Sequence, residues 1–143
     1  REPSDVGAVK QGLMQGIVDA IATDHAPHAG AEKMQEFERC PFGIIGLETA
    51  LGLTLEQLYH PGHVDLAHLV RLFTGNPARG LSLNRGALRS GDAADVTVFS
   101  LDRQWTYDVS HSASKSSNTP FHGRKFKGGP VATIVAGQIV WRL

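Results

Sequence analysis

The spacing of hydrophobic residues at the start of the chain predicts a helix. Ser4 is of a type that caps helices, and Gly16 marks a stop. The apolar positions between them recur at roughly helical spacing: Val6, Val9, Leu13 and Met14. The next segment, residues 17–23, is apolar and rich in β-branched residues, so we predict a short buried strand there.

Helical patterns return after a polar loop that runs from Asp24 to about Phe42. Leucine and isoleucine positions predict a helix over residues 43–59, which ends at Pro61-Gly62. Asp65 is predicted to cap a second helix that runs through Phe73, and Asn76-Pro77 to head a short third one.

The period changes after Asn84. Residues 94–100 alternate in the manner of a strand, and residues 130–143 predict two strands joined by a tight turn at Ala136-Gly137. We therefore predict a boundary that separates an α/β segment, residues 1–84, from a small all-β domain, residues 85–143.

The first segment has the rhythm of an α/β protein but only one evident strand. One strand forms no sheet, so its partners are expected from another chain or from a region before Arg1. A (β/α)₈ barrel needs about 250 residues. We therefore expect this chain, which opens at Arg1 without a methionine, to be the C-terminal part of such a barrel.

Composition narrows the possible partners. Lysine plus arginine and aspartate plus glutamate both number 14, so there is no basic surplus to suggest nucleic acid. The apolar stretches fall short of the roughly 20 residues that a membrane span needs. Cys40 is the only cysteine, which excludes an intrachain disulfide and fits a cytoplasmic protein.

Titratable side chains gather where the predicted strand ends. Asp24, His25 and His28 follow directly, and barrel enzymes place their active sites at the C-terminal ends of strands. A carboxylate there can bind a divalent metal or act as a general base, and His28 can bind an anionic substrate. A plain turn is the alternative, in which Asp24 accepts backbone hydrogen bonds and Pro27 fixes φ.

Five motifs carry a family resemblance. They are "TDHAPH" (23–28), "CPFGIIGLETAL" (40–51), "LFTGNPAR" (72–79), the glycine pattern from Gly86 to Phe99, and "SKSSNTPF" (114–121). In this order they resemble the C-terminal portion of the dihydroorotases, most closely the bacterial type within the cyclic amidohydrolases. The glycine pattern marks only the superfamily, whereas "TDHAPH" with Pro41-Phe42-Gly43 is narrower.

The resemblance implies a metal-dependent TIM barrel with a small β-domain, a composite β-sandwich, that interconverts dihydroorotate and N-carbamoyl-L-aspartate in pyrimidine biosynthesis. Asp24 would contact a zinc ion and carry a proton to the leaving amide nitrogen. His28 would bind the substrate, and Phe42 and Gly43 would close on it through their backbone. His25 is expected to be structural. The remaining zinc ligands would precede Arg1, so the chain alone is expected to be inactive.

Two alternatives remain open. The first is a hydantoinase- or allantoinase-like cyclic amidohydrolase, which would share Asp24 but for which His28 is less expected. The second is a non-catalytic dihydroorotase-like partner of aspartate transcarbamoylase, against which the presence of Asp24 and His28 argues. Expected partners are thus the small-molecule substrate and either a second copy or a transcarbamoylase.

Overall fold

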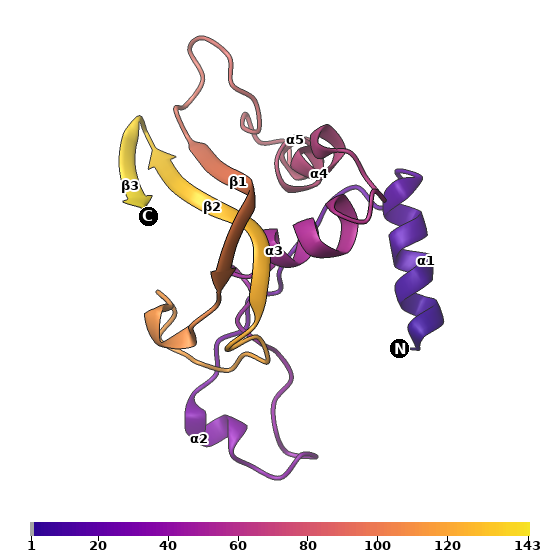
Figure 1. Cartoon of the computed structure of the whole chain (residues 1–143), viewed down its shortest axis with the longest axis vertical. Helices are drawn as coiled ribbons and strands as arrows, with labels where there is room; N and C mark the ends of the chain where they lie inside the picture. Colours follow the sequence, from indigo (N-terminus) through magenta and orange to yellow (C-terminus); the bar gives the residue numbers. More distant parts are fainter. Residues whose placement is uncertain (1) are drawn as a thin grey trace.

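Short helices and a curved antiparallel sheet make up the computed structural model, which describes residues 2–143 (Figure 1). The helical elements are α1 (Pro3–Met14), α2 (Gly30–Lys33), α3 (Ala50–Thr54), the π-helix η1 (Leu55–Tyr59), α4 (Leu66–Phe73), α5 (Gly75–Gly80) and the 3₁₀ turn η2 (Val109–His111). The strands are β1 (Val96–Thr106), β2 (Lys125–Val135) and β3 (Gln138–Arg142).

The first predicted helix is confirmed, with a start one residue before Ser4. Pro3 occupies the first turn of α1, where its missing N–H is not needed. The backbone N–H of Glu2 donates to the Asp5 carboxylate at 2.7 Å, which closes the N-terminal end. Gly16 adopts a positive φ of 70° just past the helix and stops it, as predicted.

The second and third predicted helices are α4 and α5. The Asp65 carboxylate accepts a hydrogen bond from the backbone N–H of His68 at 2.6 Å, so the predicted cap of α4 is confirmed. Helix α5 begins earlier than predicted, at Gly75 after Thr74, and Asn76-Pro77 therefore lies inside its first turn.

The helix predicted over residues 43–59 is wrong in its first half. Residues 44–46 run extended and form backbone hydrogen bonds with other segments: Ile44 accepts one from Ala26, and Ile45 donates one to Asn118. These long-range contacts override the local helical pattern. The helix forms only from Ala50 onward, as α3 followed by η1.

The strand predicted over residues 17–23 is not assigned as a strand. A strand exists through hydrogen bonds to a neighbour, and within residues 2–143 this segment has no strand beside it. Its backbone is held instead at single points, such as the 3.0 Å hydrogen bond from Ile21 N–H to the Leu72 carbonyl.

The all-β prediction for the C-terminal part is confirmed in its strands and extended in their length. β1 continues to Thr106, and the sheet order is β1-β2-β3 with both pairs antiparallel. Ala136 and Gly137, both with positive φ (49° and 78°), form the tight turn between β2 and β3. Two consecutive residues with positive φ are the signature of a type I′ hairpin.

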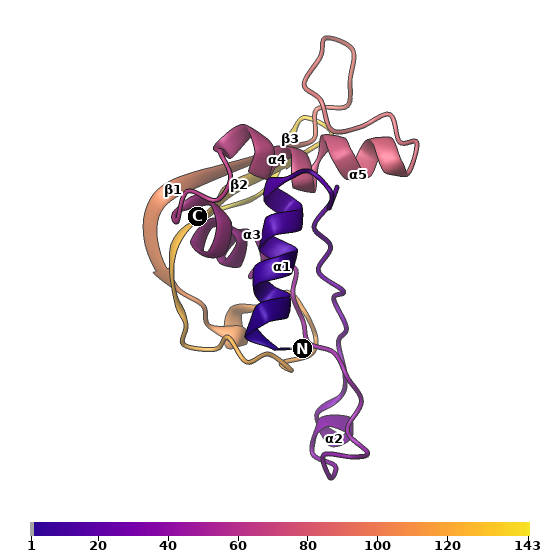
Figure 2. The same ribbon diagram turned by 90° about the vertical axis from the view of Figure 1, so that its right-hand side faces the viewer.

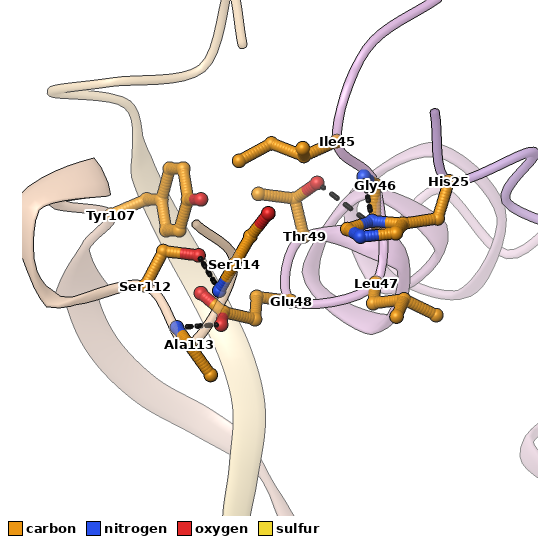
Figure 3. A pocket seen from close by; sticks show the side chains of 10 residues that line it. All are labelled: His25, Ile45, Gly46, Leu47, Glu48, Thr49, Tyr107, Ser112, Ala113 and Ser114. Carbon is orange, nitrogen blue, oxygen red and sulfur yellow. Dashed lines mark hydrogen bonds between the residues drawn. The ribbon is translucent and has the colours of Figure 1, made fainter. Parts of the chain in front are cut away.

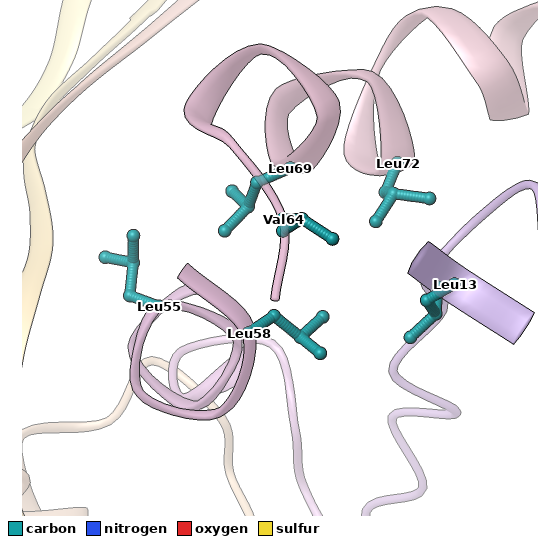
Figure 4. Close-up of a cluster of buried hydrophobic side chains, with 6 residues drawn as sticks. All are labelled: Leu13, Leu55, Leu58, Val64, Leu69 and Leu72. Carbon is teal, nitrogen blue, oxygen red and sulfur yellow. The ribbon is translucent and has the colours of Figure 1, made fainter. Parts of the chain in front are cut away.

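The core lies where the helices meet (Figure 4). Six aliphatic side chains from α1, η1, α4 and the preceding turn are buried together: Leu13, Leu55, Leu58, Val64, Leu69 and Leu72. The sheet packs on α3 through Phe126 of β2, which is 1% exposed. A Cβ at Gly52 would lie 3.0 Å from the Phe126 ring, so glycine allows this close approach of α3 to the sheet.

A loop with α2 at its start projects away from both the helices and the sheet (Figures 1 and 2). It carries large exposed apolar side chains, among them Met34 and Phe37. None of the helices within residues 2–143 is long and apolar enough to cross a membrane.

Candidate active site

Two segments from either side of the projecting loop lie side by side and form the base of the candidate site. His25 and Ile44 form a parallel β-bridge, and the Ala26 N–H donates to the Ile44 carbonyl at 2.9 Å. The Gly46 N–H donates to Nδ1 of His25 at 3.1 Å. The loop therefore leaves and re-enters the body of the protein at one place, next to Asp24 and His28.

Asp24 stands at the head of this arrangement with an exposed side chain. Its φ of 44° lies in the left-handed region, which aspartate tolerates better than most non-glycine residues. Among residues 2–143 no hydrogen bond or ion pair engages its carboxylate. The carboxylate is thus open to a ligand from outside the described segments.

The His28 side chain folds back onto the segment that follows the projecting loop, residues 42–46. Its Nε2 lies 2.9 Å from the Phe42 carbonyl oxygen, which can only accept, so the ring donates through Nε2. Nδ1 faces the Glu32 carboxylate at 3.5 Å, and the side chain keeps 24% exposure. The structure therefore joins His28 to Phe42, two of the residues predicted to bind the substrate.

Gly43 occupies a backbone position that excludes a side chain. Its φ is 113°, and a Cβ there would lie 2.5 Å from the Ala26 Cβ. Glycine is thus required twice, by its dihedral angle and by the close approach of the two segments. The neighbouring Phe42 ring is 90% exposed, so only the backbone of this pair is held in the site.

Asn118 ties these pieces together, and sequence reasoning did not assign it a role. Its side-chain amide donates to the carbonyls of Ala26 (2.9 Å) and Gly43 (3.2 Å), and its Oδ1 accepts from the His28 N–H (3.2 Å). Its only signal in the sequence was its place in the "SKSSNTPF" motif. A partner 92 residues away leaves no periodic pattern.

A cavity of about 190 Å³ opens on the side of the site where His25 lies (Figure 3). The Glu48 carboxylate accepts from the Ala113 N–H at 2.7 Å, which anchors the segment after β1 over the start of α3. Tyr107, 4% exposed, and Ser112 form the opposite wall. His25 lines this cavity and supports the Gly46 backbone, which is a structural contact.

The described part of the chain holds one candidate metal ligand rather than a metal site. Residues 2–143 contain no group of three or more histidine, cysteine or acidic side chains that could hold a metal ion. Zinc sites use three or four protein ligands. Asp24 fits a zinc ion only as one carboxylate ligand, with the others supplied by a different segment.

Sequence comparison identifies the family of this chain. The sequence model of the amidohydrolase family matches residues 1–140, and the chain belongs to that family. This family is metal-dependent, typically on zinc.

Relatives narrow the similarity further. The chain is 61% identical to the dihydroorotase of Solibacter usitatus over 134 residues, which is 94% of this chain and 31% of that protein. It is 48% identical to the dihydroorotase of Endomicrobium trichonymphae over 144 aligned residues, which cover 100% of this chain and 34% of that protein. The chain thus spans about a third of the length of these relatives.

Solved structures show the same fold. The L-hydantoinase (dihydropyrimidinase) of Arthrobacter aurescens superposes over 99% of this chain and 33% of its own, with a TM-score of 0.90 and 28% identity. The dihydropyrimidinase of Brevibacillus agri gives a TM-score of 0.90 at 21% identity, over 99% of this chain and 32% of its own. The chain therefore has the amidohydrolase fold over the part that it covers.

Proposed function

We propose that this chain is the C-terminal part of a zinc-dependent dihydroorotase. The proposed reaction is the reversible hydrolysis of (S)-dihydroorotate to N-carbamoyl-L-aspartate, a step of de novo pyrimidine biosynthesis, in the cytoplasm. One observation carries the proposal: 61% identity to a dihydroorotase over nearly the whole chain, the loop of Asp24 and His28 included.

Residues 1–84 are proposed to complete a (β/α)₈ barrel, and residues 85–143 to form most of a small β-domain beside it. The segment 17–23 lacks a neighbouring strand within residues 2–143, as expected of a barrel strand whose partners lie in another part of the enzyme. A largely apolar groove of about 860 Å³, lined by Leu51, Leu69 and Phe73 of the helices and Phe99 of β1, offers these partners a surface to cover.

The proposed chemistry assigns Asp24 a double role. Zinc, when bound, supplies a Lewis acid that activates water at neutral pH. The Asp24 carboxylate would be one ligand of the metal, would accept a proton from the attacking water and would deliver it to the amide nitrogen as the C–N bond of the ring breaks. Its exposed position at the end of segment 17–23 leaves the carboxylate open to a ligand.

His28 and the segment of residues 42–46 are proposed to hold the substrate. Hydrogen bonding to Phe42 O fixes the His28 ring at the edge where the substrate carboxylate is proposed to bind. Phe42 and Gly43 place their backbone at the same edge, where Gly43 allows a close approach because it has no side chain.

Two other functions have less support. The likeness to an L-hydantoinase favours a common fold, but its identity of 28% is far below the 61% shared with a dihydroorotase. A non-catalytic subunit of an aspartate transcarbamoylase assembly would need no open carboxylate at position 24. Partnership with a second copy or with a transcarbamoylase is compatible with either function.

The test joins this chain to the N-terminal two-thirds of the Solibacter usitatus dihydroorotase, in place of the matching segment. With zinc, the assembled enzyme is expected to consume dihydroorotate and to leave hydantoin and allantoin untouched. Asp24→Asn should lower kcat by about 10²-fold or more, because the proton carrier is lost. Asp102→Asn, the same chemical change at a carboxylate of β1 that is 83% exposed, is the matched control and should keep full activity.

Two results would contradict the proposal. One is a preference of the assembled enzyme for hydantoin or allantoin, which would favour the related substrate class. The other is unchanged turnover in the Asp24→Asn variant, which would remove Asp24 from the chemistry.

A further inference from the structure

The Asn118 carboxamide bridges two converging loops through three hydrogen bonds. One amino group donates to two carbonyls, of Ala26 at 2.9 Å and Gly43 at 3.2 Å, while the carbonyl oxygen accepts from the His28 N–H at 3.2 Å. The backbone carbonyl of Asn118 also accepts from the Ile45 N–H at 3.1 Å. The half-buried side chain therefore bridges both segments at the base of the projecting loop.

Only a primary amide satisfies all these partners. The two carbonyls need a donor, and the His28 N–H needs an acceptor on the same side chain. Aspartate offers only acceptors when ionised, and its charge would face the Ala26 and Gly43 carbonyl oxygens. Alanine offers neither. The pattern of partners thus specifies the residue type at position 118, beyond its size.

The groups that Asn118 holds are the backbone of the proposed substrate site. Asn118 holds the main chain of His28, and the ring of His28 contacts the Phe42 carbonyl. It also holds the carbonyl of Gly43, the residue after Phe42. It makes no hydrogen bond to Asp24, the proposed metal ligand and proton carrier. Asn118 therefore contacts the residues proposed to bind the substrate and makes no direct contact of this kind with the proposed proton carrier.

We propose that Asn118 is a positioning residue. It sets the distance between the His28 loop and the Phe42-Gly43 segment and thereby the affinity for substrate. This inference rests on the proposed function for the identity of the substrate. The positioning itself is a property of the 143-residue chain and can be measured without any substrate.

The first experiment measures amide hydrogen exchange by NMR in the assembled enzyme described above and in its Asn118→Ala and Asn118→Asp variants. Loss of the bonds to Ala26 O and Gly43 O should accelerate exchange at the Ala26 N–H, which bonds Ile44, by about tenfold or more in both variants. The His28 N–H should accelerate more in the alanine variant, because aspartate keeps an acceptor for it. Asn76→Asp makes the same chemical change in α5, where the side chain accepts a hydrogen bond from Arg79, and should leave these amides unchanged.

The Ile45 N–H serves as an internal reference because its acceptor is the main chain of residue 118, which every variant retains. Protection at Ile45 with faster exchange at Ala26 supports the proposal. Unchanged exchange at Ala26 overturns it. Equal acceleration at Ile45 also overturns it, because Asn118 would then dock its whole segment rather than position two loops.

The second experiment measures kinetics in the assembled enzyme described above. Asn118→Asp should raise KM for dihydroorotate by about tenfold and change kcat by less than about threefold, because the Asp24 carboxylate is untouched. A fall in kcat at constant KM, the result of a smaller folded fraction, would overturn the inference. If the assembled wild type fails to turn over dihydroorotate, the proposed function fails, and the exchange data still decide the role of Asn118.

Discussion

One added methyl group at Gly43 probes the contact between the two segments at the candidate site. In Gly43→Ala the new Cβ would lie 2.5 Å from the Ala26 Cβ, a separation that carbon atoms do not tolerate. The residue would also have to keep a φ of 113°, where an L side chain is strained. Relief requires the segments to separate, which weakens the bond between Ala26 N–H and Ile44 O and the bond between Asn118 and Gly43 O.

The expected loss of stability is the sum of two contributions, the backbone strain at position 43 and the weakened hydrogen bonding between the segments. Strained backbone of this kind costs about 1–3 kcal/mol. A weakened backbone hydrogen bond adds about 0.5–1.5 kcal/mol. We therefore expect Gly43→Ala to lower the free energy of unfolding by roughly 2–4 kcal/mol.

Urea denaturation followed by circular dichroism measures this loss. The matched control is Gly30→Ala, at the start of α2, where a Cβ would meet nothing within 4 Å. It should leave stability unchanged or raise it by about 0.4–1 kcal/mol, since alanine has less freedom in the unfolded chain. The Ala26→Gly background separates the terms, because it removes the atom that the new Cβ strikes and leaves the strained φ.

Two outcomes would refute this reasoning. If Gly43→Ala unfolds within about 0.5 kcal/mol of the wild type, neither strain nor clash is present at this position. If its cost is the same in the wild-type background and in the Ala26→Gly background, the clash contributes nothing and the segments are farther apart than the structure has them.

Two further predictions concern the sheet and the loop after β1. Phe126→Ala removes a ring that is 1% exposed and stacked on Trp105 at 5.0 Å, and should lower the free energy of unfolding by about 3–5 kcal/mol. The control Phe37→Ala removes a ring that is 92% exposed and should lower it by less than about 0.5 kcal/mol. Equal losses for the two variants in denaturation experiments would contradict this packing. Hydrogen bonds from the Ser110 hydroxyl and N–H hold the pKa of the Asp108 carboxyl below its ordinary value, so its stabilisation is present at neutral pH and is lost as pH falls through that lowered pKa. Ser110→Ala should raise this pKa in an NMR titration, and an unmoved pKa would show that the hydroxyl does not act on it.

Local signals predicted the elements whose stabilising contacts are themselves local. Helix α4 begins where Asp65 predicts it, because the cap and the helix are a few residues apart. The turn at Ala136-Gly137 is likewise set by its own two residues. The domain boundary between residues 84 and 85 stays a prediction. Elements on its two sides pack closely: β2, which contains Phe126, lies against η1, which contains Leu55.

Predictions failed where the partner is distant in sequence. Residues 44–46 have a helical pattern but pair with Ala26 and Asn118, so the helix starts late. Segment 17–23 has the composition of a strand, yet a strand also needs a neighbour. The position of Asp24 and His28 after an apolar segment predicts their chemistry, and a family resemblance adds Phe42 and Gly43. The fold brings His28, Phe42 and Gly43 together without testing their roles.

The contacts of Asn118 also matter for anyone who recombines this chain with its relatives. Its partners Ala26, His28 and Gly43 lie 75 to 92 residues earlier in the chain. Any crossover placed between Gly43 and Asn118, including one at the predicted boundary, takes the amide from one parent and the loops from the other. Libraries built from such crossovers should therefore be chosen so that position 118 is inherited with the loops it bridges.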